Sequence, residues 1–300
     1  MMNESLLVLL FLTLVLAVLA LIFYLRTQKE VVDQEIAGEF FESQCGPLYY
    51  QVHGRKGPWV LLVHGIGSST YCWRHIVPEL KNDFRLVTLD LWGFGNSSKD
   101  LTTPMSLDEQ VQILLNLIEH LNIQQYYYVG HSLGGEIGLW LSLQDPRISK
   151  CVAITPSAHP KLVSNIIKKF TWVAKWTPVW LNKKTIHRLL LKLIREKSLI
   201  DEEMIDSYYR PYQEASAHLS FVAALNIISD PRVFDNLHRV PKGTVMLWGK
   251  TDQVIPRKIA QKIQSQSPQA EHFTHPTAGH LPTEDDSPWV VAHLKDQLKP

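Results

Sequence analysis

The sequence lacks an excess of charge of either sign. Its 30 Lys and Arg residues stand against 29 Asp and Glu residues, which leaves a formal net charge of +1. Proteins that bind nucleic acid through its phosphates usually present a strongly basic surface. The overall charge therefore gives no reason to expect a nucleic-acid partner, and we expect none.

Cysteine is scarce as well. Its three residues, Cys45, Cys72 and Cys151, are far apart and form no CxxC pair. This odd, widely spaced set excludes a disulfide framework, and neither Cys nor His recurs at the spacing of zinc ligands. We therefore expect three buried thiols and no metal site. The sequence also has no internal repeat and, apart from one apolar run, no low-complexity segment.

The apolar run extends from Leu6 to Leu25, and none of its 20 residues is charged. At 1.5 Å per residue a helix of this length spans about 30 Å, which matches the hydrocarbon core of a bilayer. The run therefore predicts an uncleaved transmembrane anchor. A cleaved signal peptide and a buried soluble helix are the alternatives. The signal peptide is disfavoured because no Lys or Arg precedes the run, and because Ala17 and Ala20 do not form an A-x-A cleavage site.

Two basic residues, Arg26 and Lys29, follow the run. The positive-inside rule then places the bulk of the chain on the cytoplasmic side of the membrane. Three thiols without an evident disulfide set agree with a reducing compartment. We expect residues 26–37 to form a linker between the anchor and a folded domain.

Beyond this linker, buried apolar runs that predict strands alternate with the 3.6-residue period of helices. This alternation is typical of an α/β fold with a mostly parallel, doubly wound sheet. The predicted elements are a hairpin over residues 40–52 that turns near Gly46 and Pro47, strands at 59–63, 84–91, 126–129, 151–154, 245–248 and 271–274, a helix capped by Ser106 and Glu109, a helix over 136–143, and a terminal helix from about Pro288.

A G-x-S-x-G motif lies between a predicted strand and a predicted helix, with Ser132 at its centre. A serine in this context occupies a turn so tight that its backbone is strained, which exposes the hydroxyl above the sheet. Glycines two residues before and after it, Gly130 and Gly134, leave room for the strand and helix to approach. The motif predicts that Ser132 is a nucleophile. An inert serine in a glycine-rich turn is the alternative.

A serine nucleophile needs a base, and the base needs an acid that fixes its tautomer. Among 13 histidines, His280 stands in a loop between the last predicted strand and the terminal helix. Asp252 stands in the equivalent loop after the strand at 245–248. Loops at the carboxyl ends of the strands are where such a sheet places its chemistry. We therefore expect Ser132 as nucleophile, Asp252 as acid and His280 as base.

A tetrahedral intermediate also requires two backbone N–H donors for its oxyanion. Leu133, directly after the nucleophile, supplies the first. The second comes from the loop that follows the strand at 59–63. We expect it from Ile66, with Gly67 as the alternative if the loop is shifted by one residue.

Five segments in this order resemble the α/β-hydrolase superfamily, within its group of lipases, esterases and carbon–carbon bond hydrolases. They are VLLVHGIGSS (60–69), LDLWGFGNSS (89–98), VGHSLGG (129–135), LWGKTDQVIP (247–256) and AGHLP (278–282). The resemblance implies the triad Ser132, Asp252 and His280. It also implies that Asp90, Gly93 and Gly95 form a structural turn. A serine at position 132 disfavours epoxide hydrolases and haloalkane dehalogenases, which use a carboxylate nucleophile.

The chain between Ser132 and Asp252 exceeds what the core elements need. We expect the core to comprise residues 38–155 and 240–300, and residues 156–239 to form a helical lid. Between residues 161 and 197 this lid has ten Lys or Arg residues and one acid, Glu196, interleaved with Phe170, Trp172, Trp176 and Trp180. Such a stretch suits an interface with anionic lipid. The alternative is that the aromatic residues face the lid's own core and the lysines a solvated surface.

The expected function is hydrolysis of carboxylic esters without a metal or organic cofactor. The resemblance to the superfamily implies that the substrates are lipid-like esters such as monoacylglycerols. Carbon–carbon bond hydrolysis is the alternative reaction. A non-catalytic interaction protein on the same scaffold is the alternative of a different class, although such proteins usually lose a triad member. The expected partners are a small-molecule or lipid ester and a membrane. The sequence indicates no particular oligomeric state.

Overall fold

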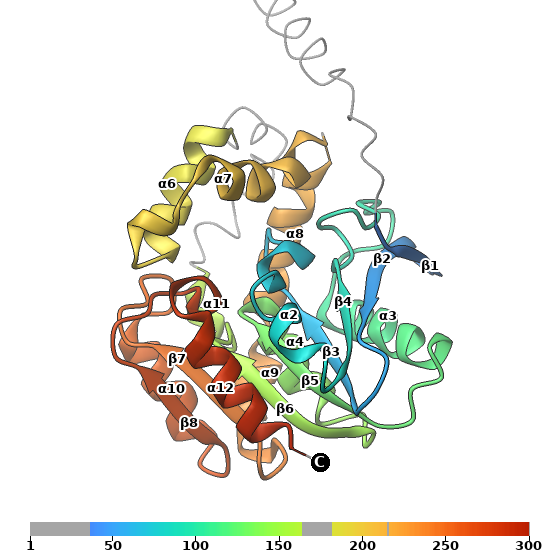
Figure 1. The fold of residues 1–300 in the computed structure, drawn as a ribbon, viewed down its shortest axis with the longest axis vertical. Coiled ribbons are helices and arrows are strands. Elements are labelled where there is room, and N and C mark those ends of the chain that lie inside the picture. Colours follow the sequence, from blue (N-terminus) through green and yellow to red (C-terminus); the bar gives the residue numbers. More distant parts are fainter. Residues whose placement is uncertain (1–36, 164–181, 215, 300) are drawn as a thin grey trace, which may run out of the picture.

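A computed structural model of the chain describes residues 37–163, 182–214 and 216–299. Its centre is one sheet of eight strands in the order β1-β2-β4-β3-β5-β6-β7-β8 (Figure 1). The strands are β1 (Glu39–Ser43), β2 (Gly46–His53), β3 (Trp59–Val63), β4 (Arg85–Leu89), β5 (Tyr126–His131), β6 (Ile148–Ile154), β7 (Val245–Gly249) and β8 (Glu271–His275).

The sheet is mostly parallel, as predicted. Neighbouring strands from β4 to β8 run parallel, whereas β1 pairs with β2, and β2 with β4, in antiparallel register. The predicted hairpin is present, but its turn lies two residues earlier than expected. Gly46 has a φ of +94° and already pairs with Ser43, so the two turn residues are Gln44 and Cys45. A glycine readily adopts this φ and so closes the turn.

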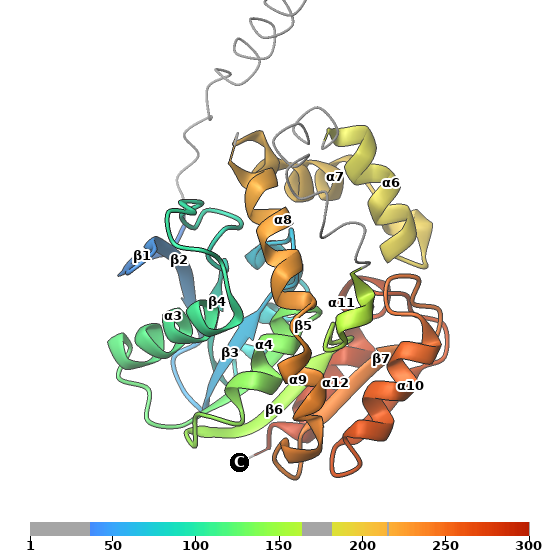
Figure 2. The ribbon, with the colours of Figure 1, turned by 180° about the vertical axis from the view of Figure 1, so that it is seen from behind.

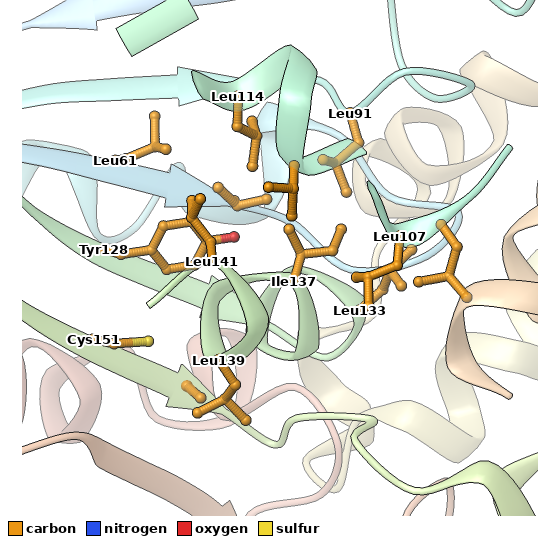
Figure 3. Packing of buried hydrophobic residues seen from close by; sticks show 14 of the residues in the cluster. Leu61, Leu91, Leu107, Leu114, Tyr128, Leu133, Ile137, Leu139, Leu141 and Cys151 are labelled. Carbon is orange, nitrogen blue, oxygen red and sulfur yellow. The ribbon is translucent and has the colours of Figure 1, made fainter. Parts of the chain in front are cut away.

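Helices cover both faces of the sheet, because side chains along each strand alternate between the faces. On β3, Leu61 and Val63 pack into the core beneath α3 (Leu107–His120), α4 (Leu133–Leu141) and α10 (Arg257–Gln266). Val60 and Leu62 pack into the core beneath α2 (Val77–Leu80) and α12 (Ser287–Gln297). Figure 3 shows Leu133, Ile137 and Leu141 of α4 packed in the first of these cores. Two further short helices are α9 (Pro231–Asp235), which packs into the first of these cores through Val233, and α11 (Pro282–Asp285).

Two predicted helix starts can be compared with the structure. Ser106 caps α3, with its hydroxyl accepting from the N–H of Glu109 as the sequence indicates. Helix α4 begins at Leu133, three residues before the predicted start at Glu136. The glycines after Ser132 concealed the earlier start, because glycine has a low helix propensity.

The chain between β6 and β7, which we call the helical segment (residues 156–239), is helical over much of its described part. Besides α9 it contains α6 (Lys183–Leu193), α7 (Glu202–Tyr209), α8 (Ala217–Ile228) and the short 3-10 turns η2 (Pro160–Leu162), η4 (Lys197–Leu199), η5 (Arg210–Gln213) and η6 (Leu237–Arg239). Helices α6 and α7 lie beyond one end of the sheet in both views (Figures 1 and 2). Their role as a lid stays a prediction.

The predicted anchor at residues 6–25 and most of the linker at 26–37 lie outside the described residues, as do Phe170, Trp172, Trp176 and Trp180. Within the described ranges, no helix has the length and apolarity to cross a bilayer. The three cysteines are buried free thiols, as predicted.

Candidate active site

Ser132 lies at the junction of β5 and α4, and its backbone has a φ of +53° and a ψ of −113°. A residue other than glycine rarely adopts a positive φ, because this conformation is unfavourable in free energy. Its presence at Ser132 indicates that the surrounding structure imposes it. The flanking glycines explain how the turn fits. A Cβ atom on Gly130 would lie 2.2 Å from the carbonyl oxygen of Gly134, and one on Gly134 would lie 2.3 Å from that of Val63. Only glycine allows this approach of strand, turn and helix.

The fold brings the three predicted triad residues together. Ser132 Oγ lies 3.1 Å from His280 Nε2, and His280 Nδ1 lies 2.8 Å from Asp252 Oδ2. A carboxylate can only accept a hydrogen bond, so Nδ1 has the proton and Nε2 is free to accept from the serine hydroxyl. The side chains of His280 and Asp252 are 5% and 4% exposed. This is the geometry of a nucleophile, a base and an orienting acid.

The second oxygen of Asp252 is also occupied. Its Oδ1 accepts from the backbone N–H groups of Val254 and Ile255, at 2.7 and 2.9 Å. Burial alone would raise the pKa of this carboxyl, but His280 and the two amides outweigh it and keep the pKa below its usual value. Asp252 is therefore ionised at neutral pH and held in one orientation.

The loop after β3 lies against the nucleophile. A Cβ atom on Gly65 would lie 3.0 Å from the Cβ of Ser132. His64 fixes this loop, because its Nδ1–H donates to the Gly65 carbonyl at 2.7 Å while its Nε2 accepts from the N–H of Leu91 at 2.9 Å. Burial lowers the pKa of His64 to about 4, so the ring is neutral.

The two expected oxyanion donors, Ile66 and Leu133, directly follow Gly65 and Ser132 in the sequence. Ile66 lines the same cavity as Ser132. Leu133 is the first residue of α4, a position whose N–H has no acceptor within its own helix. Gly67, the alternative donor, has a φ of +70° and lies beside Tyr212 of the helical segment. Ile66 and Leu133 therefore stay the predicted pair of donors, with Gly67 as the alternative to Ile66.

A cavity of about 230 Å³ opens at Ser132 and His280. The helical segment supplies much of its wall, and loops of the core supply the rest. Its described lining is apolar apart from a few neutral polar groups, and it includes no Lys, Arg, Asp or Glu. The apolar lining residues include Ile66, Leu162, Val163, Ile186, Leu190, Leu193, Phe221, Leu225, Ile228 and Ile255.

Two side chains that the sequence did not indicate as part of the site bind the backbone of the predicted base, His280. His131 Nε2–H and Thr155 Oγ1–H both donate to the backbone carbonyl of His280, at 2.8 and 3.1 Å. Burial, reinforced by the neighbouring His280 ring, lowers the pKa of His131 to about 3, which keeps it neutral. His131 is part of the G-x-S-x-G motif, where its position gave no indication of this contact.

A carboxylate in α11 connects the loop of His280 to the helical segment. Asp285 Oδ2 accepts from the N–H of Gly279 at 2.7 Å, and its Oδ1 accepts from the N–H groups of Arg195 and Glu196 at 2.7 and 3.0 Å. The neighbouring Glu284 pairs with Arg74 at 2.6 Å and accepts from the hydroxyl of Tyr208 at 3.0 Å. Neither carboxylate was predicted, because all of these partners except Gly279 are 76 or more positions away in the sequence.

Asp90 has the structural role that the sequence predicts. Its Oδ1 accepts from the N–H of Thr70 at 2.6 Å and its Oδ2 from that of Asn96 at 2.7 Å. Gly93 and Gly95, at φ values of +95° and +54°, complete the turn. Burial raises the pKa of Asp90 to about 6.

Within the described part of the chain, no group of three His, Cys, Asp or Glu residues could bind a metal ion.

The sequence profile of the alpha/beta hydrolase fold family matches residues 58–287. The chain is 29% identical to the uncharacterized hydrolase YugF of Bacillus subtilis (strain 168), over 84% of this chain and 94% of that one. It is 26% identical to a pimeloyl-[acyl-carrier protein] methyl ester esterase of Vibrio vulnificus (strain YJ016), over 80% and 94%. It is also 25% identical to a 2-hydroxy-6-oxo-6-(2'-aminophenyl)hexa-2,4-dienoic acid hydrolase of Metapseudomonas resinovorans, over 81% and 84%.

Proposed function

Because the chain belongs to the alpha/beta hydrolase fold family, we propose that it is a serine hydrolase that cleaves carboxylic esters through an acyl-enzyme intermediate. One observation supports this more than any other: the continuous contact from Ser132 Oγ to His280 Nε2 and from His280 Nδ1 to Asp252 Oδ2, at 3.1 and 2.8 Å. A serine at its free pKa is a weak nucleophile, and an adjacent base such as His280 activates it.

In the proposed mechanism, Nε2 of His280 takes the hydroxyl proton of Ser132 as Oγ attacks the ester carbonyl. The N–H groups of Ile66 and Leu133 donate to the oxyanion that forms. The intermediate collapses to an acyl-enzyme, and His280 returns the proton to the leaving alcohol. His280 then deprotonates a water molecule, which releases the acid product and restores Ser132. Asp252 stays ionised throughout and stabilises the imidazolium.

The cavity lining supports an uncharged, largely apolar substrate. Burying a carboxylate without a cationic partner costs several kcal/mol, and the described lining contains neither Lys nor Arg. A carbon–carbon bond hydrolase that acts on an ionised acid needs such a partner, so this alternative is disfavoured. Lipid-like acyl esters, including monoacylglycerols, have the required apolar chain and neutral ends.

The uncharged stretch at residues 6–25 complements this substrate class. We propose that it anchors the enzyme in a membrane with the hydrolase domain on the cytoplasmic side, where water-insoluble esters partition into the same bilayer. The basic helical segment then faces anionic headgroups.

A serine-directed fluorophosphonate probe tests the reaction class. We expect it to label the full-length protein, and we expect Ser132→Ala to abolish both labelling and ester hydrolysis, with a loss of about 10⁴-fold or more in rate. Ser265→Ala, an exposed serine on α10, is the matched control and should leave both unchanged. Full activity in a folded Ser132→Ala protein would rule out the mechanism. Absence of labelling and of hydrolysis across a panel of esters would favour the non-catalytic scaffold.

A further inference from the structure

An acid and a hydroxyl that the mechanism above does not use lie next to the nucleophile. Glu136 is on α4, one turn after Ser132, and it is completely buried. Its Oε2 lies 2.7 Å from the hydroxyl oxygen of Ser157. Its other oxygen, Oε1, is buried and has no hydrogen-bond partner within the described ranges. A buried polar atom without a partner is uncommon and calls for an explanation.

The surroundings of Glu136 favour its neutral form. Burial raises the pKa of this carboxyl well above its usual value, and the charge of Asp230 raises it further, against the opposing effect of the Ser157 hydrogen bond. No cation forms an ion pair with it within the described residues. Asp230 itself is paired with Arg232 at 2.7 Å, so that arginine is already engaged. Complete burial without a paired cation therefore favours the carboxylic acid over the carboxylate.

A neutral acid changes the direction of the contact with Ser157. The O–H of a carboxylic acid is a strong donor, and a serine hydroxyl can accept as well as donate. With the acid proton on Oε2, Glu136 donates to Ser157 Oγ, and the hydroxyl proton of Ser157 becomes available to a second acceptor. The 2.7 Å separation is ordinary for an O–H···O bond in either direction. This arrangement also leaves only a carbonyl-type oxygen of Glu136 unpaired, rather than a donor.

Ser157 is placed where that proton is useful. It lines the same cavity as Ser132 and His280. Its backbone N–H donates to the backbone carbonyl of Ser132 at 3.3 Å, so Ser157 is attached directly to the nucleophile. Around it the lining is predominantly apolar, and a hydroxyl in such a wall discriminates between ligands that can and cannot accept its hydrogen bond.

We propose that Ser157 is a substrate-binding residue that donates to an uncharged acceptor oxygen of the substrate near the scissile ester, and that Glu136 is the positioning residue that directs the Ser157 hydroxyl toward it. This inference rests on the proposed function. It narrows the substrate class to esters with an additional carbonyl, ether or hydroxyl oxygen within a few atoms of the reacting carbonyl. A monoacylglycerol, whose alcohol has free hydroxyls, is one member of this class. An ionised group is disfavoured because the described lining has no cation.

Matched ester pairs test the contact in the full-length protein. In the acyl pair, p-nitrophenyl 4-oxopentanoate is compared with p-nitrophenyl pentanoate. In the alcohol pair, 2-methoxyethyl butanoate is compared with butyl butanoate. The quantity measured is the ratio of kcat/KM within each pair, because differences in folded fraction cancel from it.

We expect Ser157→Ala to lower this ratio for at least one pair by roughly 3- to 10-fold, the range for loss of one neutral hydrogen bond. Ser157→Thr keeps the hydroxyl and should keep the ratio. Ser142→Ala makes the same chemical change at the end of α4, where the hydroxyl donates to the Leu139 carbonyl, and should leave the ratio unchanged. Unaltered ratios for both pairs in a Ser157→Ala protein that still hydrolyses the plain esters would overturn the assignment.

Glu136 is tested by conservative rescue. A glutamine can donate through its amide to Ser157 Oγ, so Glu136→Gln should retain the ratio, whereas Glu136→Leu should lower it as Ser157→Ala does. If Glu136→Gln lowered the ratio and Glu136→Leu did not, the hypothesis that Glu136 acts as a neutral hydrogen-bond donor would be wrong. Fluorophosphonate labelling of the wild-type protein and of each variant distinguishes failure of the proposed function from failure of the proposed role of Ser157 and Glu136. Failure of labelling and of all hydrolysis by the wild-type protein refutes the proposed function, whereas retained hydrolysis with unchanged ratios refutes only the role of Ser157 and Glu136.

Discussion

The backbone N–H of His280 donates a hydrogen bond of 2.8 Å to the carbonyl oxygen of Leu193, the last residue of α6. The loop of the proposed base is thus attached directly to the helical segment that forms the cavity wall. Asp285 reinforces this attachment from the other side, because it accepts from amides of both the loop and the segment. The position of the base and the shape of the cavity are therefore coupled.

Asp285→Ala should weaken catalysis as well as stability. The substitution leaves the N–H groups of Gly279, Arg195 and Glu196 without their acceptor. A small displacement of the base can cost roughly 10- to 100-fold in rate, and an unsatisfied polar group costs about 1 to 3 kcal/mol where it is buried. Steady-state kinetics and thermal unfolding measure the two effects. Asp296→Ala, an exposed acid on α12, is the control. A stability loss without any fall in kcat would contradict the coupling.

Asp252→Asn should lower kcat by about 10⁴-fold, because an amide can donate to Nδ1 and so stabilise the wrong tautomer of His280. Asp90→Asn should act through stability instead, since both oxygens of Asp90 accept backbone N–H groups of its own turn. Asp235→Asn, an exposed aspartate, controls for the change of charge. Turnover per folded molecule discriminates between the two acids. Loss of turnover in folded Asp90→Asn with normal turnover in Asp252→Asn would reassign the acid.

Acidification should destabilise the fold through its buried histidines. His64 has a pKa of about 4 in the native protein, whereas a histidine in the unfolded chain has a pKa of about 6.5. Between these values the unfolded chain binds a proton that the native protein does not bind. Stability is therefore complete above pH 6.5 and is lost as the pH falls toward 4, by up to about 1.4 kcal/mol per pH unit. His131 acts in the same direction over a window that extends to about pH 3.

Asp90 acts in the opposite direction. Its native pKa of about 6 exceeds the ordinary aspartate value of 3.8, so the native protein retains a proton that the unfolded chain has lost between those values. Its contribution to stability is present below pH 3.8 and is lost as the pH rises to 6. Chemical denaturation from pH 7 to 4 should therefore show a shallower acid loss for His64→Asn than for the wild type, and a steeper one for Asp90→Asn. Identical slopes in all three proteins would contradict the buried neutral His64 and Asp90.

Removal of residues 1–30 tests the proposed anchor. Because this stretch contains the apolar run at 6–25, its removal should leave hydrolysis of a short soluble ester nearly unchanged and reduce hydrolysis of long-chain monoacylglycerol in vesicles. Added salt should weaken any residual vesicle binding by the basic helical segment. Equal losses on both substrates would indicate a folding role for the stretch. No loss on either would leave it with a role in location only.

The sequence was sufficient for the features that depend on local patterns. The strand at Trp59–Val63 has the predicted bounds, and the loops after β5, β7 and β8 place Ser132, Asp252 and His280 at one end of the sheet, because parallel strands share that end. The roles of Asp285 and Glu284 could not be predicted from the sequence. Asp285 binds amides 89 and 90 residues away, and Glu284 pairs with an arginine 210 residues away. Such contacts depend on tertiary packing and leave no periodic signal.

The long separation between Ser132 and its partners has a consequence for biosynthesis. His280 lies 148 residues after Ser132, and Asp252 precedes His280 by 28. At 5–20 residues per second, roughly 7 to 30 s pass between synthesis of the serine and of the histidine. Throughout that interval a nascent chain has a serine without its proposed base, so the proposed hydrolysis cannot take place. The proposed activity therefore requires that β8 has joined the sheet and that the loop after it has reached α6.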